Sequence, residues 1–274
     1  MKIAFIGQKG IPATTGGVER RVDELSVRMV RMGHAVSVYV RDNYTEKSLR
    51  EYKGVRLIHL PSIPTKHLDA ISHTFLATMH ALFQDYTIVH YQAPGPSSLS
   101  WIIRVFKKKS ALVATFNSRD DLHQKWGPAG RLYLRLGEYV ICKAPKKTAV
   151  LTTILKQYVA EKYGTQTVVI PNGCAIQYNA DTSLLRQWGL HEKRYMLCVS
   201  RLIHHKGIHY LIDAFKQLDA AGALPGNFKL VIVGFGFHTD DYVDLLTRMS
   251  AGKANIVFTG TQTGAALEQL FSHP

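Results

Sequence analysis

The sequence has few cysteines, relatively few acidic residues and no long hydrophobic run, and each shortage excludes a class of protein. Its cysteines, Cys142, Cys174 and Cys198, are odd in number and widely spaced, which argues against a disulfide framework or a zinc site. No apolar run approaches the roughly 18 residues that a membrane-spanning helix needs. The segment Lys2–Ile6, apolar from Ile3 onward, is too short for the core of a signal peptide. These absences predict a cytoplasmic protein with reduced thiols.

Acidic residues are also scarce relative to basic ones. The 274 residues include 20 Asp and Glu against 34 Lys and Arg, a net charge of +14. Such a charge attracts polyanions: phosphorylated substrates, an anionic membrane or nucleic acid. Nucleic acid is not expected as a partner, because the sequence contains no recognition-helix or aromatic-platform motif.

The densest basic run is Lys107–Lys109, directly after the apolar segment Trp101–Phe106. Two interpretations fit it. The favoured one is a core helix whose basic end matches the helix dipole. The other is a patch that binds a membrane surface, because apolar and aromatic residues adjoin the lysines.

Short apolar runs alternate with helical patterns along the chain, which predicts an α/β fold with parallel, doubly wound sheets. Strands are expected at residues 2–6, 35–40, 55–60, 87–91, 111–116, 148–151 and 167–170, and then at 195–199, 228–233 and 255–258. Helices are expected at residues 18–32, 68–83, 131–142, 154–163, 208–218, 242–251 and 265–271. Pro171 and Gly173 end the first series of strands. The sequence therefore predicts a first domain over residues 1–175, a linker over 176–190 and a partial second domain over 191–274.

The most informative segment is Tyr195–Phe215, in which a buried strand is followed by Arg201, Lys206 and a helical pattern. The two cations stand at the carboxyl end of a strand, where open α/β sheets bind ligands. Cations beside a helix N-terminus suit a phosphate or a diphosphate. The segment therefore predicts an anion site, and a nucleotide derivative is the expected ligand.

A glycine-rich connection, residues 7–19, joins the first predicted strand to the first predicted helix. Glycines let the backbone approach a ligand and present free N–H groups to a phosphate. The spacing is neither that of a dinucleotide fingerprint nor that of a P-loop. A flexible strand–helix connection and a phosphate site both fit these residues.

Several segments, taken together and in order, resemble glycosyltransferase family 4, whose members use nucleotide sugars and have the two-domain GT-B fold. The segments are Gly16–Arg20, Val89–Pro96, Val169–Gly173, Val199–Leu202 with Lys206 and Gly207, Leu230–Gly236 and Asn255–Gly260. The resemblance implies two Rossmann-like domains and retaining transfer of a hexose-type sugar from a nucleoside-diphosphate sugar. It implies a saccharide or lipid-linked acceptor, a role in cell-surface polysaccharide synthesis and a place at the cytoplasmic face of an anionic membrane.

The resemblance also assigns roles to residues. Arg201 and Lys206 would carry catalysis by neutralising the leaving diphosphate, because electrostatic stabilisation of this kind is usually the largest catalytic effect. Other residues would bind the donor or lie on the acceptor side: Gly16, Gly17, Asn172, Gly234 and Gly236 for the donor, and His90, Asn117 and Asp120 for the acceptor. No cofactor and no divalent metal are expected, in agreement with the absence of an Asp-x-Asp pair from the sequence.

The sequence departs from the family's pattern at two places. Where members carry a histidine after the fifth strand, this chain has Asn117, which can hydrogen-bond a sugar but cannot act as an acid or base near neutral pH. The family's two glutamates, separated by seven residues, have no counterpart in residues 1–274. The donor domain is therefore expected to be truncated and its activity impaired or lost. The alternative function is a nucleotide- or anion-binding module without catalysis.

Overall fold

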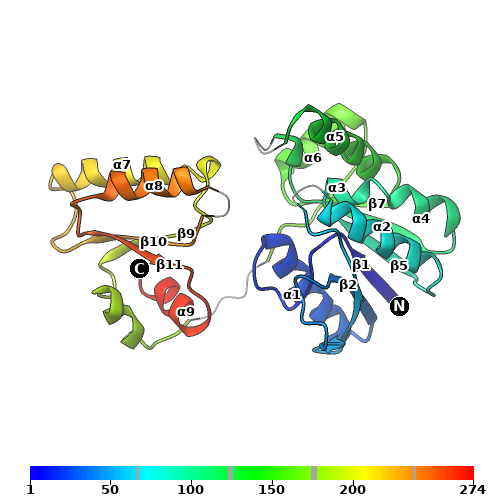
Figure 1. Ribbon diagram of the computed structural model, residues 1–274, viewed down its shortest axis with the longest axis horizontal. Coiled ribbons are helices and arrows are strands. Elements are labelled where there is room, and N and C mark those ends of the chain that lie inside the picture. The colour runs from blue at the N-terminus through cyan, green and yellow to red at the C-terminus, as the bar shows by residue number, and fades with distance from the viewer. Residues whose placement is uncertain (66–67, 123–125, 174–177, 237–238) are drawn as a thin grey trace. The chain divides into compact units, whose positions relative to one another are not determined.

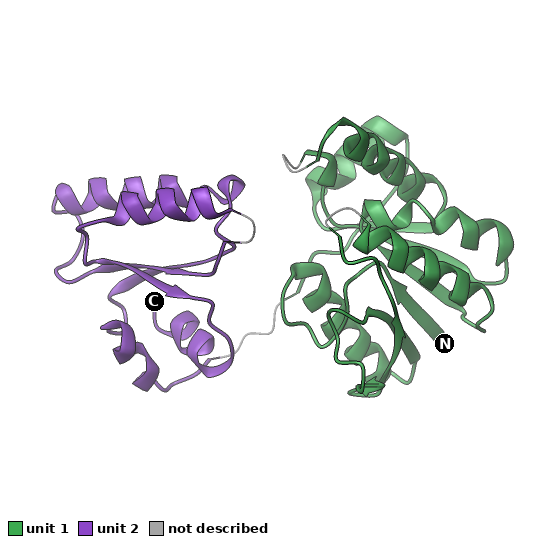
Figure 2. Ribbon diagram, in the orientation of Figure 1, with its two compact units in different colours: residues 1–173 green, residues 174–274 purple. Residues whose placement is uncertain are grey.

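The computed structural model describes residues 1–65, 68–122, 126–173, 178–236 and 239–274. The chain divides into two compact units, Met1–Gly173 and Cys174–Pro274, each described by itself below (Figure 2). Of the cysteines, Cys142 is buried, Cys198 is half-buried, and both are free thiols, while Cys174 lies outside the described residues. In the described residues, no helix combines the length and the apolar character that crossing a membrane requires.

The first unit is built on an eight-stranded sheet with the strand order β3-β4-β2-β1-β5-β6-β7-β8 (Figure 1). Its strands are β1 (Lys2–Ile6), β2 (Ala35–Arg41), β3 (Glu51–Tyr52), β4 (Val55–Leu60), β5 (Ile88–Gln92), β6 (Ala111–Phe116), β7 (Lys147–Val150) and β8 (Val168–Val169). All neighbours pair in parallel except β3, which runs antiparallel to β4. The chain winds outward from β1 to one edge and then from β5 to the other. The switch point between β1 and β5 is where sheets of this kind bind ligands.

Helices cover both faces of this sheet. They are α1 (Gly17–Arg31), α2 (Asp69–Leu82), α3 (Pro94–Ser97), α4 (Ser100–Phe106), α5 (Pro128–Lys143) and α6 (Thr153–Tyr163). Successive residues of β1 point to opposite faces, as strand geometry requires. Ile3 and Phe5 join a core that includes Val22 of α1, whereas Ala4 and Ile6 join a core with residues of α2, α4, α5 and α6.

The second unit has a three-stranded parallel sheet with the order β11-β10-β9, formed by β9 (Tyr195–Val199), β10 (Lys229–Val233) and β11 (Ile256–Gly260). On one face lie α7 (Ile208–Ala220) and α8 (Asp240–Ser250), and on the other lie η2 (Ser183–Trp188) and α9 (Gly264–Ser272) (Figure 1). Leu230 and Ile232 belong to the core beneath α7 and α8, whereas Val231 and Val233 belong to the core beneath η2 and α9. Although η2 falls in the range expected to be a linker, its Leu185 is buried in the core of this unit.

Candidate functional site

In the second unit, Arg201 and Lys206 follow the carboxyl end of β9. Both side chains are exposed, and within the described part of the chain neither makes a hydrogen bond or an ion pair. Lys206 ends the short helix η3 (His204–Lys206), and Gly207, the N-cap of α7, has the left-handed conformation with φ 67°. Burial raises the pKa of the Cys198 thiol, and the charge of Lys206 opposes that rise, so the ammonium lies near the end of β9.

The loops after β9 and β10 lie side by side at this edge. The Leu202 N–H donates to the Phe235 carbonyl at 2.9 Å, and Thr239 Oγ1 donates to the Leu202 carbonyl at 2.8 Å. A side chain at Gly234, whose φ is 142°, would overlap the carbonyl oxygen of Ser200. A Cβ at Gly236 would lie 2.5 Å from Val243 Cγ2. The packing of the loops therefore already requires both glycines, and their contact with a nucleotide remains a prediction.

In the first unit, the switch point between β1 and β5 is closely packed. Gly7 follows β1 with φ 110°, and Ala93 follows β5 with φ 68°. A Cβ at Gly7 would lie 2.6 Å from the Gln92 carbonyl oxygen and 2.8 Å from Pro96 Cβ. Only glycine fits this position without displacing the neighbouring backbone.

The glycine-rich segment between β1 and α1 is an ordered loop, because side chains hold its backbone. The hydrogen bonds run from the N–H groups of Lys9 to Glu19 (3.1 Å), Ala13 to Asp23 (2.8 Å), and Thr14 and Thr15 to Tyr44 Oη (2.9 and 3.0 Å). Gly16, with φ 97°, is the N-cap of α1 and offers no side-chain cap. Nothing lies within 4 Å of the Cβ position of Gly17, so this helix N-terminus faces open space.

Arg21 reaches across the switch point from α1 to the loop after β6, and the sequence alone did not reveal it. Its Nη1 donates to Asn117 Oδ1 at 3.1 Å. Burial lowers the pKa of the Arg21 guanidinium, which has no carboxylate partner among the described residues. Asn117 Nδ2 is buried and has no hydrogen-bond partner among the residues that the structure describes.

His90 lies on β5 beside this pair. Its Nε2 is 2.8 Å from Thr115 Oγ1, and its ring stacks on Phe5 with centroids 5.0 Å apart. Burial, and then the charge of Arg21, lower the pKa of His90 to about 3. The imidazole is therefore neutral near pH 7 and can hydrogen-bond but not carry a charge.

The remaining predicted residues lie at other places. Asp120 begins η1 (Asp120–Leu122) and accepts a hydrogen bond from Ser118 Oγ at 2.6 Å. Its neighbour Asp121 is buried and pairs with Arg119 at 3.4 Å, a structural role. Asn172 is exposed beyond β8 at the end of the first unit. In the first unit, the structure thus gathers four predicted residues at the carboxyl ends of the strands: Gly16, Gly17, His90 and Asn117. In the second unit, it gathers four others at the carboxyl ends of the strands of the second sheet: Arg201, Lys206, Gly234 and Gly236.

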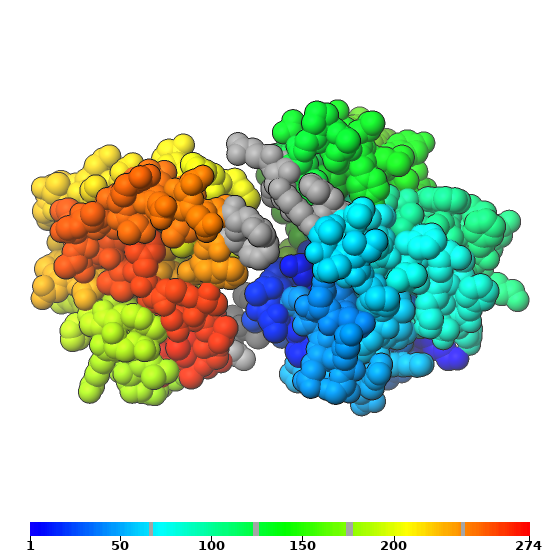
Figure 3. Space-filling view, viewed as in Figure 1, coloured from blue at the N-terminus to red at the C-terminus, as the bar shows by residue number. Residues whose placement is uncertain are grey.

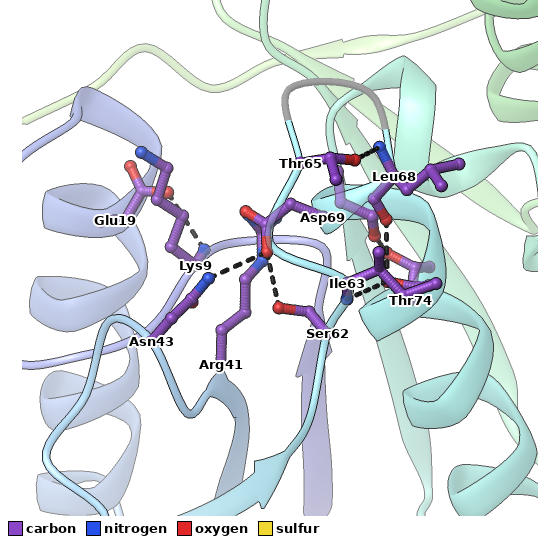
Figure 4. A network of polar contacts seen from close by, with 12 residues as sticks. Lys9, Glu19, Arg41, Asn43, Ser62, Ile63, Thr65, Leu68, Asp69 and Thr74 are labelled. Carbon is purple, nitrogen blue, oxygen red and sulfur yellow. Dashed lines mark hydrogen bonds and ion pairs between the residues drawn. The ribbon is translucent and has the colours of Figure 1, made fainter.

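A second arginine at the edge of the first sheet, Arg41, has a carboxylate counterion. Arg41 Nη1 lies 2.5 Å from Asp69 Oδ2, and Asn43 and Ser62 also donate to Asp69 (Figure 4). Burial alone would raise the pKa of Asp69, but the Ser62 hydrogen bond and the charge of Arg41 hold it below its usual value. This network fixes the ends of β2, β4 and α2 and leaves no charge for a ligand.

Two family models match the chain. The model described as Glycosyltransferase Family 4 matches residues 15–178, and the model described as Glycosyl transferases group 1 matches residues 182–273. Among curated relatives, the O-antigen chain mannosyltransferase C of Escherichia coli is 25% identical over 272 residues, which cover 95% of this chain and 67% of the relative.

Solved structures of similar fold include Anabaena Alr3699/HepE in complex with UDP-glucose, with a TM-score of 0.72 and 22% identity. The match covers 98% of this chain and 71% of that one. Another is WaaG, a glycosyltransferase involved in lipopolysaccharide biosynthesis, with a TM-score of 0.68 and 17% identity over 98% of this chain and 72% of WaaG. At these identities the likeness shows the fold, which is GT-B.

Proposed function

Because the chain belongs to glycosyltransferase family 4, we propose that it moves a sugar from a nucleoside-diphosphate sugar to a saccharide or lipid-linked acceptor in cell-surface polysaccharide synthesis. The family is one of retaining enzymes, so the transferred sugar keeps its anomeric configuration. The relatives support the assignment by their names, which include an O-antigen mannosyltransferase, a protein solved with UDP-glucose and a lipopolysaccharide glycosyltransferase.

The observation that carries the proposal is the pair of cations after β9. Arg201 and Lys206 are exposed and have no partner within the described residues, so both are available to a ligand. When the bond from sugar to phosphate breaks, negative charge accumulates on the departing diphosphate. Each cation about 4 Å from that charge stabilises it by about 1–4 kcal/mol, depending on how much water remains. Because this stabilisation grows as the bond breaks, it lowers the barrier.

On the acceptor side, we propose that the first unit positions a hydroxyl by hydrogen bonds. Because the pKa of His90 is lowered to about 3, its neutral imidazole is a weak base, and the amide of Asn117 has no basic site near neutral pH, so neither is expected to remove a proton from the acceptor. The buried Nδ2 of Asn117, which has no partner among the described residues, is a donor suited to a sugar oxygen. Asp120, in the loop after β6, is the carboxylate proposed to contact the acceptor. Gly17, at the open N-terminus of α1, and the exposed Asn172 are proposed to contact the donor.

Titration calorimetry with UDP, GDP, ADP and their sugars tests the donor site. One nucleoside diphosphate is expected to bind, and Arg201→Ala should weaken it by about tenfold or more, the effect of losing a charge-assisted hydrogen bond. Arg194→Ala is the matched control, because Arg194 is also exposed but precedes the opposite, amino end of β9. If no nucleotide in the panel binds, the proposed donor site is wrong.

Transfer from a radiolabelled donor sugar tests catalysis. Because no two glutamates in residues 1–274 are separated by seven residues, we propose that these residues alone bind the diphosphate better than they transfer its sugar. Slow release of sugar that depends on Lys206 would support an enzyme. Binding with no release under any condition would support the alternative, a nucleotide- or anion-binding module.

We further propose that the protein associates peripherally with an anionic membrane at the cytoplasmic face, where a lipid-linked acceptor would be found. The net charge of +14 supports this, because basic residues near an anionic bilayer contribute about 1 kcal/mol each. Failure to bind anionic vesicles at low salt would contradict the association.

A further inference from the structure

Helix α5 of the first unit has an exposed apolar stripe. Leu132, Leu136 and Tyr139 are 70%, 54% and 54% exposed, although residues of these types are usually buried. Their spacing of four and three residues places them on one face of the helix. Leu122, which precedes the helix in η1, is 63% exposed. In the space-filling view, this green part of the chain lies at the surface of the first unit (Figure 3).

The opposite face of α5 is firmly fixed, so the exposed stripe is not a result of loose packing. A Cβ on Gly137 would overlap the carbonyl oxygen of Pro94, which shows how closely α3 and α5 approach. Tyr133 Oη donates to the Gly95 carbonyl at 2.8 Å. Glu138, which is fully buried, accepts hydrogen bonds from Tyr158 and Tyr163 at 2.8 Å. These contacts determine which face of α5 points outward.

The outward side of α5 is also basic. Arg131, Arg135 and Lys143 are exposed, and Glu138, the only acidic residue of the helix, is buried. Of the three cations, Arg135 lies 3.9 Å from the carboxylate of Asp121, and Lys143 Nζ donates one hydrogen bond to the carbonyl of Tyr163 at 2.6 Å. The solvent-facing side of α5 therefore combines leucine and tyrosine with positive charge and no negative charge of its own.

We infer that the outward face of α5 docks on the surface of an anionic phospholipid bilayer. An exposed apolar stripe flanked by cations is the pattern of a helix that lies in the membrane interface. The apolar side chains enter the acyl boundary, tyrosine suits the headgroup level, and arginine and lysine pair with lipid phosphates. The inference rests on the proposed peripheral association, to which it assigns a surface.

The position of α5 relates this surface to the proposed acceptor residues. The chain leaves β6 at Phe116, passes Asn117 and Asp120, and enters α5 at Pro128. The N-terminal end of the helix is thus joined to the sheet edge where the acceptor is proposed to bind. A bilayer on this face would present a lipid-linked acceptor next to that edge.

The lysine run after α4 is the competing surface. Lys107 Nζ donates to the carbonyl of Leu82 at 3.0 Å and to that of Gln84, so it caps the end of α2. Phe83 and Phe106 beside it are 83% and 69% exposed. They supply a matched control, because their replacement removes apolar surface of similar exposure next to equally basic residues.

Co-sedimentation with vesicles of phosphatidylcholine and phosphatidylglycerol tests the inference, using the whole chain. The triple variant Leu132→Ser, Leu136→Ser, Tyr139→Ser is expected to lose about tenfold or more in membrane partitioning. The control variant Phe83→Ser, Phe106→Ser should bind like the wild type. Arg131→Gln should weaken binding to these vesicles and leave binding to pure phosphatidylcholine unchanged. Circular dichroism confirms that each variant is folded.

Several results would overturn the inference. If the triple variant binds as well as the wild type, or only the Phe83 and Phe106 variant loses binding, α5 is not the docking surface. If the wild type binds no vesicles, both the peripheral association and the docking surface are wrong. Nucleotide binding measured on the triple variant separates these outcomes from failure of the donor site, because the substitutions lie outside it.

Discussion

Replacing Glu138 by glutamine removes the buried charge that anchors α5 to α6, and the structure sets the size of the effect. The carboxylate is fully buried and accepts hydrogen bonds from Tyr158 Oη and Tyr163 Oη at 2.8 Å, while Lys162 Nζ lies 3.3 Å away. Burial and then the hydrogen bond to Glu138 raise the pKa of Tyr163, and the same two effects raise that of Tyr158 against the opposing hydrogen bond from Lys162. Both tyrosines are therefore donors to the carboxylate at any moderate pH.

The cost of Glu138→Gln follows from what glutamine cannot do. A hydrogen bond to a charged acceptor contributes about 1.5–3 kcal/mol, against about 0.5–1.5 kcal/mol for a neutral one, so each phenol loses about 1 kcal/mol. The lost pairing with Lys162 adds less than about 1 kcal/mol, because that side chain is 40% exposed and can return to water. The free energy of unfolding should fall by about 2–3 kcal/mol, which lowers the Tm of a unit of this size by about 5–10 °C.

Thermal unfolding followed by circular dichroism and calorimetry at pH 7 measures this change. Glu161→Gln is the control, because it makes the same substitution at an exposed position of α6 beside Lys162. It should alter the free energy of unfolding by less than about 0.5 kcal/mol. Equal melting temperatures for the two variants would refute the argument that the buried carboxylate anchors α5.

The remaining predictions concern the packing and the acid stability of the first unit. In a urea titration, Gly7→Ala should lower the free energy of unfolding by at least about 2 kcal/mol, because φ is 110° and the new Cβ would lie 2.6 Å from a carbonyl oxygen. The control Gly33→Ala, at φ 82° with open space around the new Cβ, should lower it by about 1 kcal/mol. Burial, and then the charge of Arg41, lower the pKa of His73 to about 4, so the unfolded chain binds this proton more readily and stability should fall as the pH drops from about 6.5 to 4. His73→Leu should remove about 3 kcal/mol of that loss in an acid titration, and an unchanged acid midpoint would contradict the assignment.

The elements that the sequence predicts well are those with a strong local pattern. The strands Lys2–Ile6, Val55–Leu60, Ala111–Phe116 and Tyr195–Val199 have the predicted bounds, because each is a short segment dominated by apolar and β-branched residues. The short β3, with two residues, has no pattern to detect. Helix α3 was missed because its four residues, two of them proline, show no helical periodicity.

The candidate site divides in the same way. Arg201 and Lys206 were predicted because a strand, two cations and a helix follow one another within one short segment. Arg21 was not, because its partner Asn117 is 96 residues away in the sequence and only the sheet order brings them together. Tyr44, which orders the glycine-rich loop, is likewise about 30 positions from the amides that it accepts from. Such contacts depend on tertiary structure, which local patterns do not encode.

Charge compensation distinguishes structural cations from those available to a ligand. Arg41 and Arg21 both lie at the carboxyl edge of the first sheet. Arg41 has the carboxylate of Asp69, whereas the side-chain partner of Arg21 in the described part of the chain is the neutral amide of Asn117. Burial without a counterion disfavours the charged guanidinium, which is why the pKa of Arg21 is lowered. The fold holds this charge at a cost, and an anion bound at the edge would offset it. Because Arg201 and Lys206 likewise have no counterion in the described residues, each unit presents an uncompensated positive edge. That common feature fits a phosphorylated substrate better than a neutral sugar alone.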